Sequence, residues 1–172
     1  MIRVELSGYQ VQKCKRFAEE SAKSQQRYEF GNHQTEERSY EKIYSDTLTG
    51  KIAEVAVVEF FRAEYGLHLP VNFEVYPRGE WDDQDIEVKG LTIDVKGSNG
   101  GKWLLFEQSK YKFRREEKTV PDMIIFCRCF GSAVKIAGCI SENRLFNPDG
   151  QNVLYTKMGR IYRAKGCSFE RR

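Results

Sequence analysis

Three side chains of types that bind divalent metal and phosphate fall within one short stretch of the chain, Asp85–Ser98. Asp94 and Lys96 are two positions apart in a run that alternates apolar and charged residues, so a β-strand there would place both on one face. Asp85 precedes them at the start of a second alternating run. Mg²⁺ prefers one or two carboxylates and leaves its other positions to water and phosphate. The spacing indicates a cation-assisted phosphate site, and the alternative is an exposed hairpin that carries alternating charges.

The same stretch predicts the hairpin that would position these side chains. Apolar and charged residues alternate on both sides of a short break, for which we expect a tight turn at Gly90–Leu91. Asp85 would then reach the end of the hairpin where Asp94 lies, and two crowded carboxylates would raise each other's pKa unless a cation sat between them. Glu87-Val88-Lys89 repeats the acid-x-Lys spacing, but it follows Asp85 too closely to leave a hairpin between them.

A long buried helix is predicted from Ser45 to Tyr65, and it carries one conspicuous acid, Glu54. Ser45 is a suitable N-cap and Gly66 a suitable C-cap, while the middle of the segment is apolar nearly all round. A buried carboxylate is costly unless it is paired or bound to metal. The alternatives for Glu54 are an ion pair with Lys51, an exposed helix edge or a metal site, and we favour the metal site.

The order Asp85, hairpin, Asp94-Val95-Lys96 resembles the PD-(D/E)XK nuclease superfamily, whose members carry Asp, a short hairpin and then Asp/Glu-x-Lys. That superfamily also places a Glu on the helix before the hairpin, where this chain has Glu54. The resemblance covers roughly residues 45–130 and departs from the pattern at Gln84, where the superfamily's name has Pro. It implies an α/β fold of the α+β type, with a restriction-endonuclease-like αβββαβ core and a mixed central sheet flanked by helices.

The resemblance also implies a Mg²⁺-dependent endonuclease, with Mn²⁺ as a substitute, that hydrolyses DNA phosphodiester bonds and leaves 5′-phosphates. Asp85 and Asp94 would hold the metal. The Val95 carbonyl, and Glu54 directly or through water, would complete its ligands, and Lys96 would position the attacking water. One such site cuts one strand, so double-strand cleavage calls for a homodimer. Two alternatives stay open: a catalytically inactive nucleic-acid-binding module on the same fold, and a nuclease for branched DNA or RNA.

Polar and basic residues outside this site predict contacts with the DNA backbone. The net charge is only +3, but basic residues cluster near the end of the chain and along a second helix expected over residues 108–118. In the superfamily that second helix packs beside the site. We expect nucleic-acid contacts from Ser98, Gln108, Lys110, Lys112, Arg114, Arg160 and Arg163. The alternative for each basic residue is a solvated charged face.

The rest of the chain indicates one domain, 1–172, without repeats or linkers. The periodicity predicts strands at 1–7, 72–76, 123–130 and 133–140, a helix at 8–26, a loop at 27–44, a short helix at 141–146, a turn at 147–150 and a final hairpin over 153–163. The five cysteines are odd in number and scattered, which speaks against a disulfide framework. No apolar run approaches the ~20 residues that a membrane span needs, and no secretory leader is visible, so we expect no membrane contact and a cytoplasmic setting.

Overall fold

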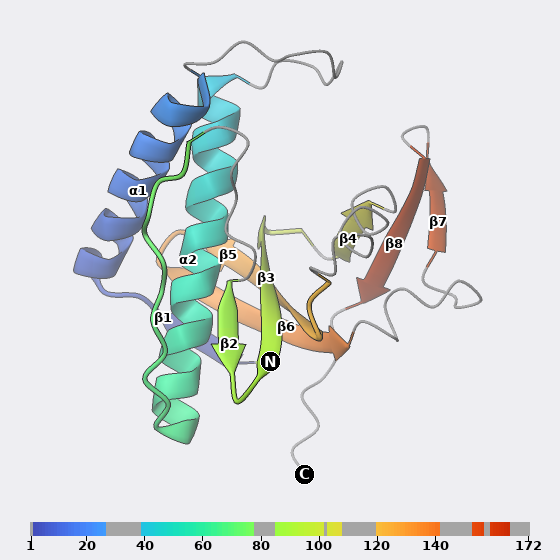
Figure 1. The fold of residues 1–172 in the computed structure, drawn as a ribbon. Coiled ribbons are helices and arrows are strands. Elements are labelled where there is room, and N and C mark those ends of the chain that lie inside the picture. Colours follow the sequence, from blue (N-terminus) through green and yellow to red (C-terminus); the bar gives the residue numbers. More distant parts are fainter. Residues whose placement is uncertain are drawn as a thin grey trace.

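The computed structural model describes residues 2–26, 39–77, 85–101, 103–107, 120–141, 153–156 and 159–165. They form two helices and two sheets (Figure 1). The elements are β1 (Ile2–Glu5), α1 (Gly8–Gln26), α2 (Tyr40–Tyr65), β2 (Ile86–Val88), β3 (Leu91–Asn99), β4 (Trp103–Glu107), β5 (Met123–Phe130), β6 (Ala133–Ser141), β7 (Val153–Thr156) and β8 (Gly159–Lys165).

The larger sheet has five strands in the order β1-β6-β5-β3-β2. Strands β3 and β5 run parallel, whereas β1/β6, β6/β5 and β3/β2 are antiparallel pairs. Three further strands make a second sheet in the order β4-β8-β7. The larger sheet is therefore mixed, which confirms the α+β class expected from the sequence.

Both helices lie on the same side of the larger sheet, with α2 against the strands and α1 packed on α2 (Figure 1). The strand residues that face α2 are apolar, among them Ile93 and Val95 of β3 and Cys127 of β5. Gly97 continues this row, and a Cβ there would lie 2.6 Å from the Thr49 carbonyl oxygen. Only glycine allows helix and strand to approach so closely. Because side chains alternate along a strand, residues 94, 96 and 98 point to the opposite face of the sheet.

Helix α2 begins at Tyr40, earlier than the Ser45 start that the sequence predicted. Ser39 is the N-cap: its backbone is extended and its hydroxyl accepts a hydrogen bond from the Lys42 N–H at 3.2 Å. The predicted loop 27–44 was thus wrong over its last five residues. The C-terminal prediction is confirmed, because Gly66 has φ 66° and its N–H bonds to the Arg62 carbonyl.

The segment 66–77 is not a strand, in contrast to the prediction for 72–76; it runs back along the two helices (Figure 1). The Asn72 side-chain oxygen accepts the Glu74 N–H at 2.8 Å, a local bond that competes with strand pairing. The segment is held to α1 by the Ser24 hydroxyl, which donates to the Tyr76 carbonyl at 3.2 Å. Local side-chain chemistry therefore overrides the alternation of Phe73 and Val75.

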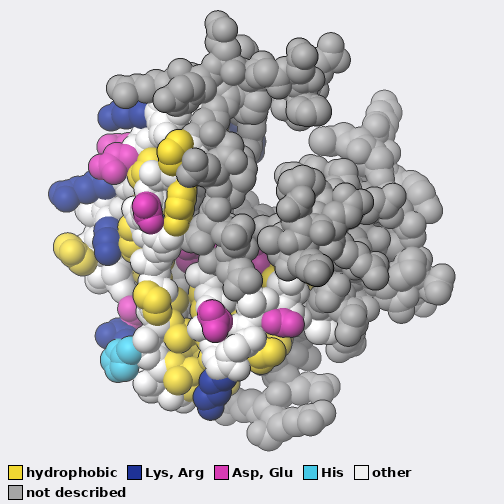
Figure 2. Space-filling view, viewed as in Figure 1, with side chains coloured by type: hydrophobic (Ala, Val, Ile, Leu, Met, Phe, Trp, Pro, Cys, Tyr) yellow, Lys and Arg dark blue, Asp and Glu magenta, His cyan; other side chains and the backbone are white. Residues whose placement is uncertain are grey.

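The remaining sequence predictions divide by whether the structure describes them. Strands β1, β5 and β6, helix α1 and the terminal β7–β8 hairpin are confirmed. The predicted helix at 108–118, most of the loop at 27–44, and the short helix and turn at 141–150, apart from Ser141 at the end of β6, lie outside the described residues. Among the described helices, none is long and apolar enough to cross a membrane. On the described part of the surface in Figure 2, acidic and basic side chains are interspersed rather than gathered by sign.

Candidate metal and phosphate site

The β2–β3 hairpin forms as the sequence predicted, but its turn is one residue earlier. Lys89 and Gly90 both have positive φ, 52° and 80°, and Leu91 already belongs to β3. Two residues with positive φ make the turn that matches the right-handed twist of paired strands. The turn fixes the register, which pairs Ile86 with Ile93.

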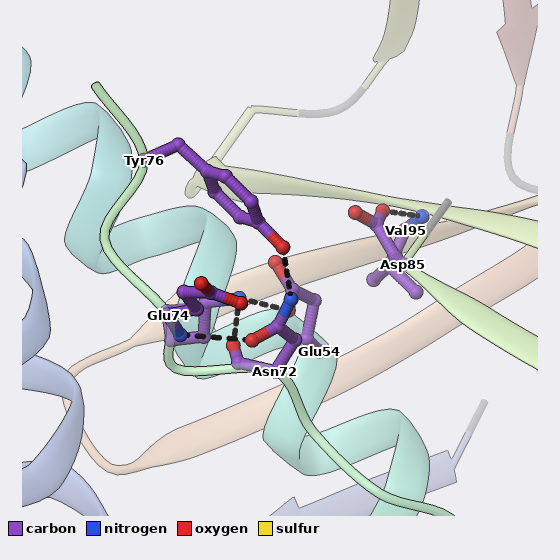
Figure 3. Close-up of polar contacts among 7 residues, drawn as sticks. Glu54, Asn72, Glu74, Tyr76, Asp85 and Val95 are labelled. Carbon is purple, nitrogen blue, oxygen red and sulfur yellow. Dashed lines mark hydrogen bonds and ion pairs between the residues drawn. The ribbon is translucent and has the colours of Figure 1, made fainter. Parts of the chain in front are cut away.

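Extending that register by one residue places Asp85 opposite Asp94, where cross-strand side chains share a face. Asp85 follows this geometry with a specific contact, because its Oδ2 accepts the Val95 N–H at 2.6 Å (Figure 3). The carboxylate takes the place that a strand carbonyl would have beyond the end of β2. This bond holds Asp85 at the edge of β3.

Asp94 and Lys96 lie on one face of β3, as their spacing predicted. The Lys96 Nζ is 2.8 Å from Asp94 Oδ1 and 2.6 Å from Oδ2. Asp94 is 4% exposed, whereas the Lys96 side chain is 36% exposed. The buried Asp94 carboxylate is therefore paired with the Lys96 ammonium, which is also exposed to solvent, where a phosphate can approach.

The electrostatics of this pair of acids favour a cation. Burial raises the pKa of Asp85, and the neighbouring negative charge of Asp94 raises it further. The Lys96 ammonium and the Val95 N–H oppose this rise without reversing it. Asp85 and Asp94 are thus close enough to repel each other, as the sequence suggested.

Glu54 forms a buried ion pair with Lys51 of the same helix. The Lys51 ammonium also donates to the Asn72 carbonyl at 2.8 Å and lies 4.7 Å from the centre of the Phe17 ring. In Figure 3, Glu54 lies beside Asn72. The pairing with Lys51 is one of the alternatives that the sequence leaves open. The Lys51 ammonium also acts to lower the pKa of Asp85, so this ion pair lies within electrostatic reach of the candidate site.

The donor set at the hairpin consists of two carboxylates and nearby backbone oxygen. Within the described ranges, no group of three or more His, Cys, Asp and Glu side chains is placed to hold a metal ion. Two carboxylates nevertheless suit Mg²⁺, which keeps several positions for water and substrate phosphate. The chemistry of Asp85 and Asp94 therefore fits a metal of that kind.

The residues expected to bind nucleic acid are only partly described. Ser98 lies on the same face as Lys96, and its Oγ accepts the Gly101 N–H at 3.1 Å, which shapes the turn after β3. Arg160 and Arg163 lie on β8, where only the backbone is described. Four candidates lie outside the described residues: Gln108, Lys110, Lys112 and Arg114.

Sequence reasoning missed one basic position close to the site. Arg128 of β5 lies opposite Ser98 in the parallel register. The signal was present, since Arg128 is the only charged residue within the apolar run 123–130. The alternation rules predict a strand there and assign its arginine no role.

Comparisons with known proteins were negative for this chain. The site is defined by Asp85, Asp94 and Lys96 from one hairpin and by the sheet face that they share with Arg128. No family model matches the chain, and no curated protein or solved structure does.

Proposed function

We propose that this protein is a Mg²⁺-dependent endonuclease that hydrolyses DNA. The observation that carries the proposal is the meeting of Asp85 and Asp94 at the end of one hairpin, with the Lys96 ammonium 2.6 Å from the Asp94 carboxylate. Two acids that repel each other beside a lysine make a site that gains from a divalent cation and a phosphate. Without a cation, the repulsion between the two acids opposes folding.

The proposed fold is the PD-(D/E)XK core, to which the chain's acid-hairpin-acid-x-Lys pattern is similar. The described elements that support it are α2, the β2–β3 hairpin and β5, which runs parallel to β3. A helix, a hairpin that carries the acids and a strand reached by a crossover follow the order of that core. In place of the core's first strand, this chain has the irregular segment 66–77.

In this proposal Asp85 and Asp94 would hold Mg²⁺, with Mn²⁺ as a substitute, and the Val95 carbonyl would be a further ligand. When bound, the metal supplies positive charge that polarises the scissile phosphate and activates a water. Lys96 neutralises charge that develops on the phosphate and holds the attacking water in line. Glu54 would complete the site directly or through water, beside its partner Lys51.

The same proposal covers the reaction products, the number of copies of the chain that act together, and the cellular setting. Products would carry 5′-phosphates, and cleavage of both strands of a duplex would need two copies of the chain. We also propose a cytoplasmic setting, supported by the absence of disulfides among Cys14, Cys127, Cys129 and Cys139.

A second candidate is a nucleic-acid-binding module without chemistry. The observation that favours it is the Lys51–Glu54 ion pair, which engages the acid that the nuclease pattern places on the helix. Branched DNA and RNA remain alternative substrates for an active enzyme. These candidates differ in whether any strand is cut when divalent metal is added.

The test is cleavage of supercoiled plasmid, four-way junctions, single-stranded DNA and RNA in Mg²⁺, in Mn²⁺ and in EDTA. We expect metal-dependent cutting of DNA, abolished in Asp94→Asn and reduced at least about 100-fold in Lys96→Met, because removing one preorganised charge-stabilising group costs that much. The matched controls are Glu87→Gln and Lys89→Gln, which alter the neighbouring acid-x-Lys of the same hairpin and should leave cleavage unchanged.

Two results would redirect the proposal. Full activity in folded Asp94→Asn and Lys96→Met would remove the site, with circular dichroism used to check folding. Retention of DNA without cleavage in either metal would favour the binding module.

A further inference from the structure

An exposed aromatic ring lies at the end of β5, flanked by two cations. Phe130 is 46% exposed, an unusual state for so large an apolar side chain. The guanidinium carbon of Arg128 lies 5.4 Å from the ring centre and the Lys135 ammonium 5.5 Å from it. Arg128 and Lys135 are directly opposite each other on β5 and β6, so both reach the ring from the same row of the sheet.

This aromatic–basic patch, defined as Phe130, Arg128 and Lys135, shares a sheet face with the candidate site. Cys127, Cys129 and their neighbours on β6 face α2, so the residues that alternate with them face away from it. Arg128 pairs in register with Ser98 of β3, two residues beyond Lys96. Phe126 is the β5 residue opposite Lys96, so Phe130 lies one strand across and four residues along from it. At about 5 Å per strand and about 3.3 Å per residue, the Cα atoms of Lys96 and Phe130 are about 14 Å apart.

Arg128 has hydrogen-bonding capacity that the described residues do not use. Its Nη2 donates to the Gly100 carbonyl at 3.2 Å, while its Nε is buried and has no hydrogen-bond partner among the described residues. Next to Lys135, Arg3 of β1 forms an exposed ion pair with Glu5 at 3.4 Å. Arg128 and Lys135 are therefore the two cations that the structure places against the Phe130 ring.

We propose that this patch binds a single nucleic-acid strand, with one base stacked on Phe130 and adjacent phosphates at Arg128 and Lys135. A ring flanked by cations complements both parts of a nucleotide, the flat base and the charged phosphate. A duplex keeps its bases stacked inside and cannot present one to the ring. The patch therefore selects unpaired strands, and binding needs no metal.

The relation of this patch to cleavage rests on the proposed function. If Asp85, Asp94 and Lys96 cut DNA, then the patch would hold the strand that leaves the site across β5 and β6. Strand binding itself does not depend on that site. The two proposals can therefore fail separately.

The test is fluorescence anisotropy in EDTA, where metal-dependent cutting cannot occur, with labelled oligothymidylate of about 16 nucleotides, a duplex of equal length and oligouridylate. We expect Phe130→Leu to weaken single-strand binding about 5- to 150-fold, the loss of one stacked base. Lys135→Gln should lower the salt dependence, log Kd against log salt, by about 0.7. Tyr9→Leu and Arg16→Gln, an exposed aromatic and a cation on α1, are the matched controls and should bind as the wild type does.

A second variant separates stacking from simple loss of fold. Phe130→Trp keeps a flat ring and should retain binding, with a quenching of its added fluorescence when oligothymidylate binds. Binding of either oligothymidylate or oligouridylate more tightly than the duplex supports the proposal. The comparison of the two shows whether the patch prefers DNA or RNA. The proposal is overturned if the duplex binds as tightly as the single strands, or if folded Phe130→Leu and Lys135→Gln match the wild type.

Discussion

Replacing Asp85 by Asn removes one of two crowded carboxylates while keeping the shape of the side chain and an oxygen that accepts the Val95 N–H. The pKa of Asp85 is raised, chiefly by burial and then by the charge of Asp94. The native protein therefore holds a proton on Asp85 more readily than the unfolded chain does. Its stability falls as the pH rises above the ordinary value of 3.8, through the window that ends at the raised pKa. Asp85→Asn should abolish this loss.

The size of the effect follows from the geometry. Cross-strand neighbours lie about 5 Å apart, and two unit charges at that distance repel by about 3 kcal/mol at an effective dielectric constant of 20. The Lys96 ammonium beside Asp94 offsets part of this repulsion. We therefore expect Asp85→Asn to stabilise the metal-free protein by about 1–2 kcal/mol at pH 7, which is about 2–8 °C in Tm.

The assay is thermal unfolding of wild type and Asp85→Asn from pH 4 to pH 8 in EDTA, repeated in Mg²⁺. The advantage of the variant should grow from near zero at pH 4. Mg²⁺ at 100 times its Kd should stabilise the wild type alone, by about 2.7 kcal/mol in the free energy of unfolding, and so raise its Tm. Asp122→Asn is the control of opposite sign, because hydrogen bonds from Thr92 lower the pKa of Asp122 and its contribution to stability is lost as the pH falls. A destabilised Asp85→Asn, or a pH-independent difference, would refute the reasoning.

Two further predictions concern the elements that support the site. Gly97→Ala should lower the free energy of unfolding in urea by about 1–3 kcal/mol, because the new Cβ meets the Thr49 carbonyl. Gly50→Ala has open space and should raise it by about 0.5–1 kcal/mol. Equal effects of the two substitutions would contradict the close approach of helix and strand. Lys51→Met removes the ammonium that neutralises the buried Glu54 carboxylate and should cost about 3–5 kcal/mol, most of it recovered in Lys51→Met/Glu54→Leu. A cost below about 1 kcal/mol would argue against the ion pair.

Alternation along one strand was enough to predict the most local part of the site. Asp94 and Lys96 share a face because strand side chains have a period of two, and the positions flanking them are apolar. The place of Asp85 opposite Asp94 follows from the turn, although the turn itself lies at Lys89–Gly90 rather than at Gly90–Leu91. Strand alternation and turn geometry therefore predict the side-chain positions within one hairpin.

Long-range contacts explain what the sequence could not predict. The buried setting of the Lys51–Glu54 pair depends on Asn72 and Phe17, which the fold brings to the same ammonium. Segment 66–77 has strand-like alternation, yet Asn72 binds its own backbone instead. The position of Arg128 next to the candidate site follows only from the parallel pairing of β3 with β5, which no local pattern predicts.

The central claim is that Asp85 and Asp94 hold a divalent metal, and a crystal grown with Mn²⁺ tests it most directly. We predict an anomalous difference peak between the two carboxylates, within about 2.5 Å of an oxygen of each, and its absence from crystals of Asp94→Asn. Mn²⁺ bound only elsewhere, or a peak that persists in Asp94→Asn, would contradict the claim.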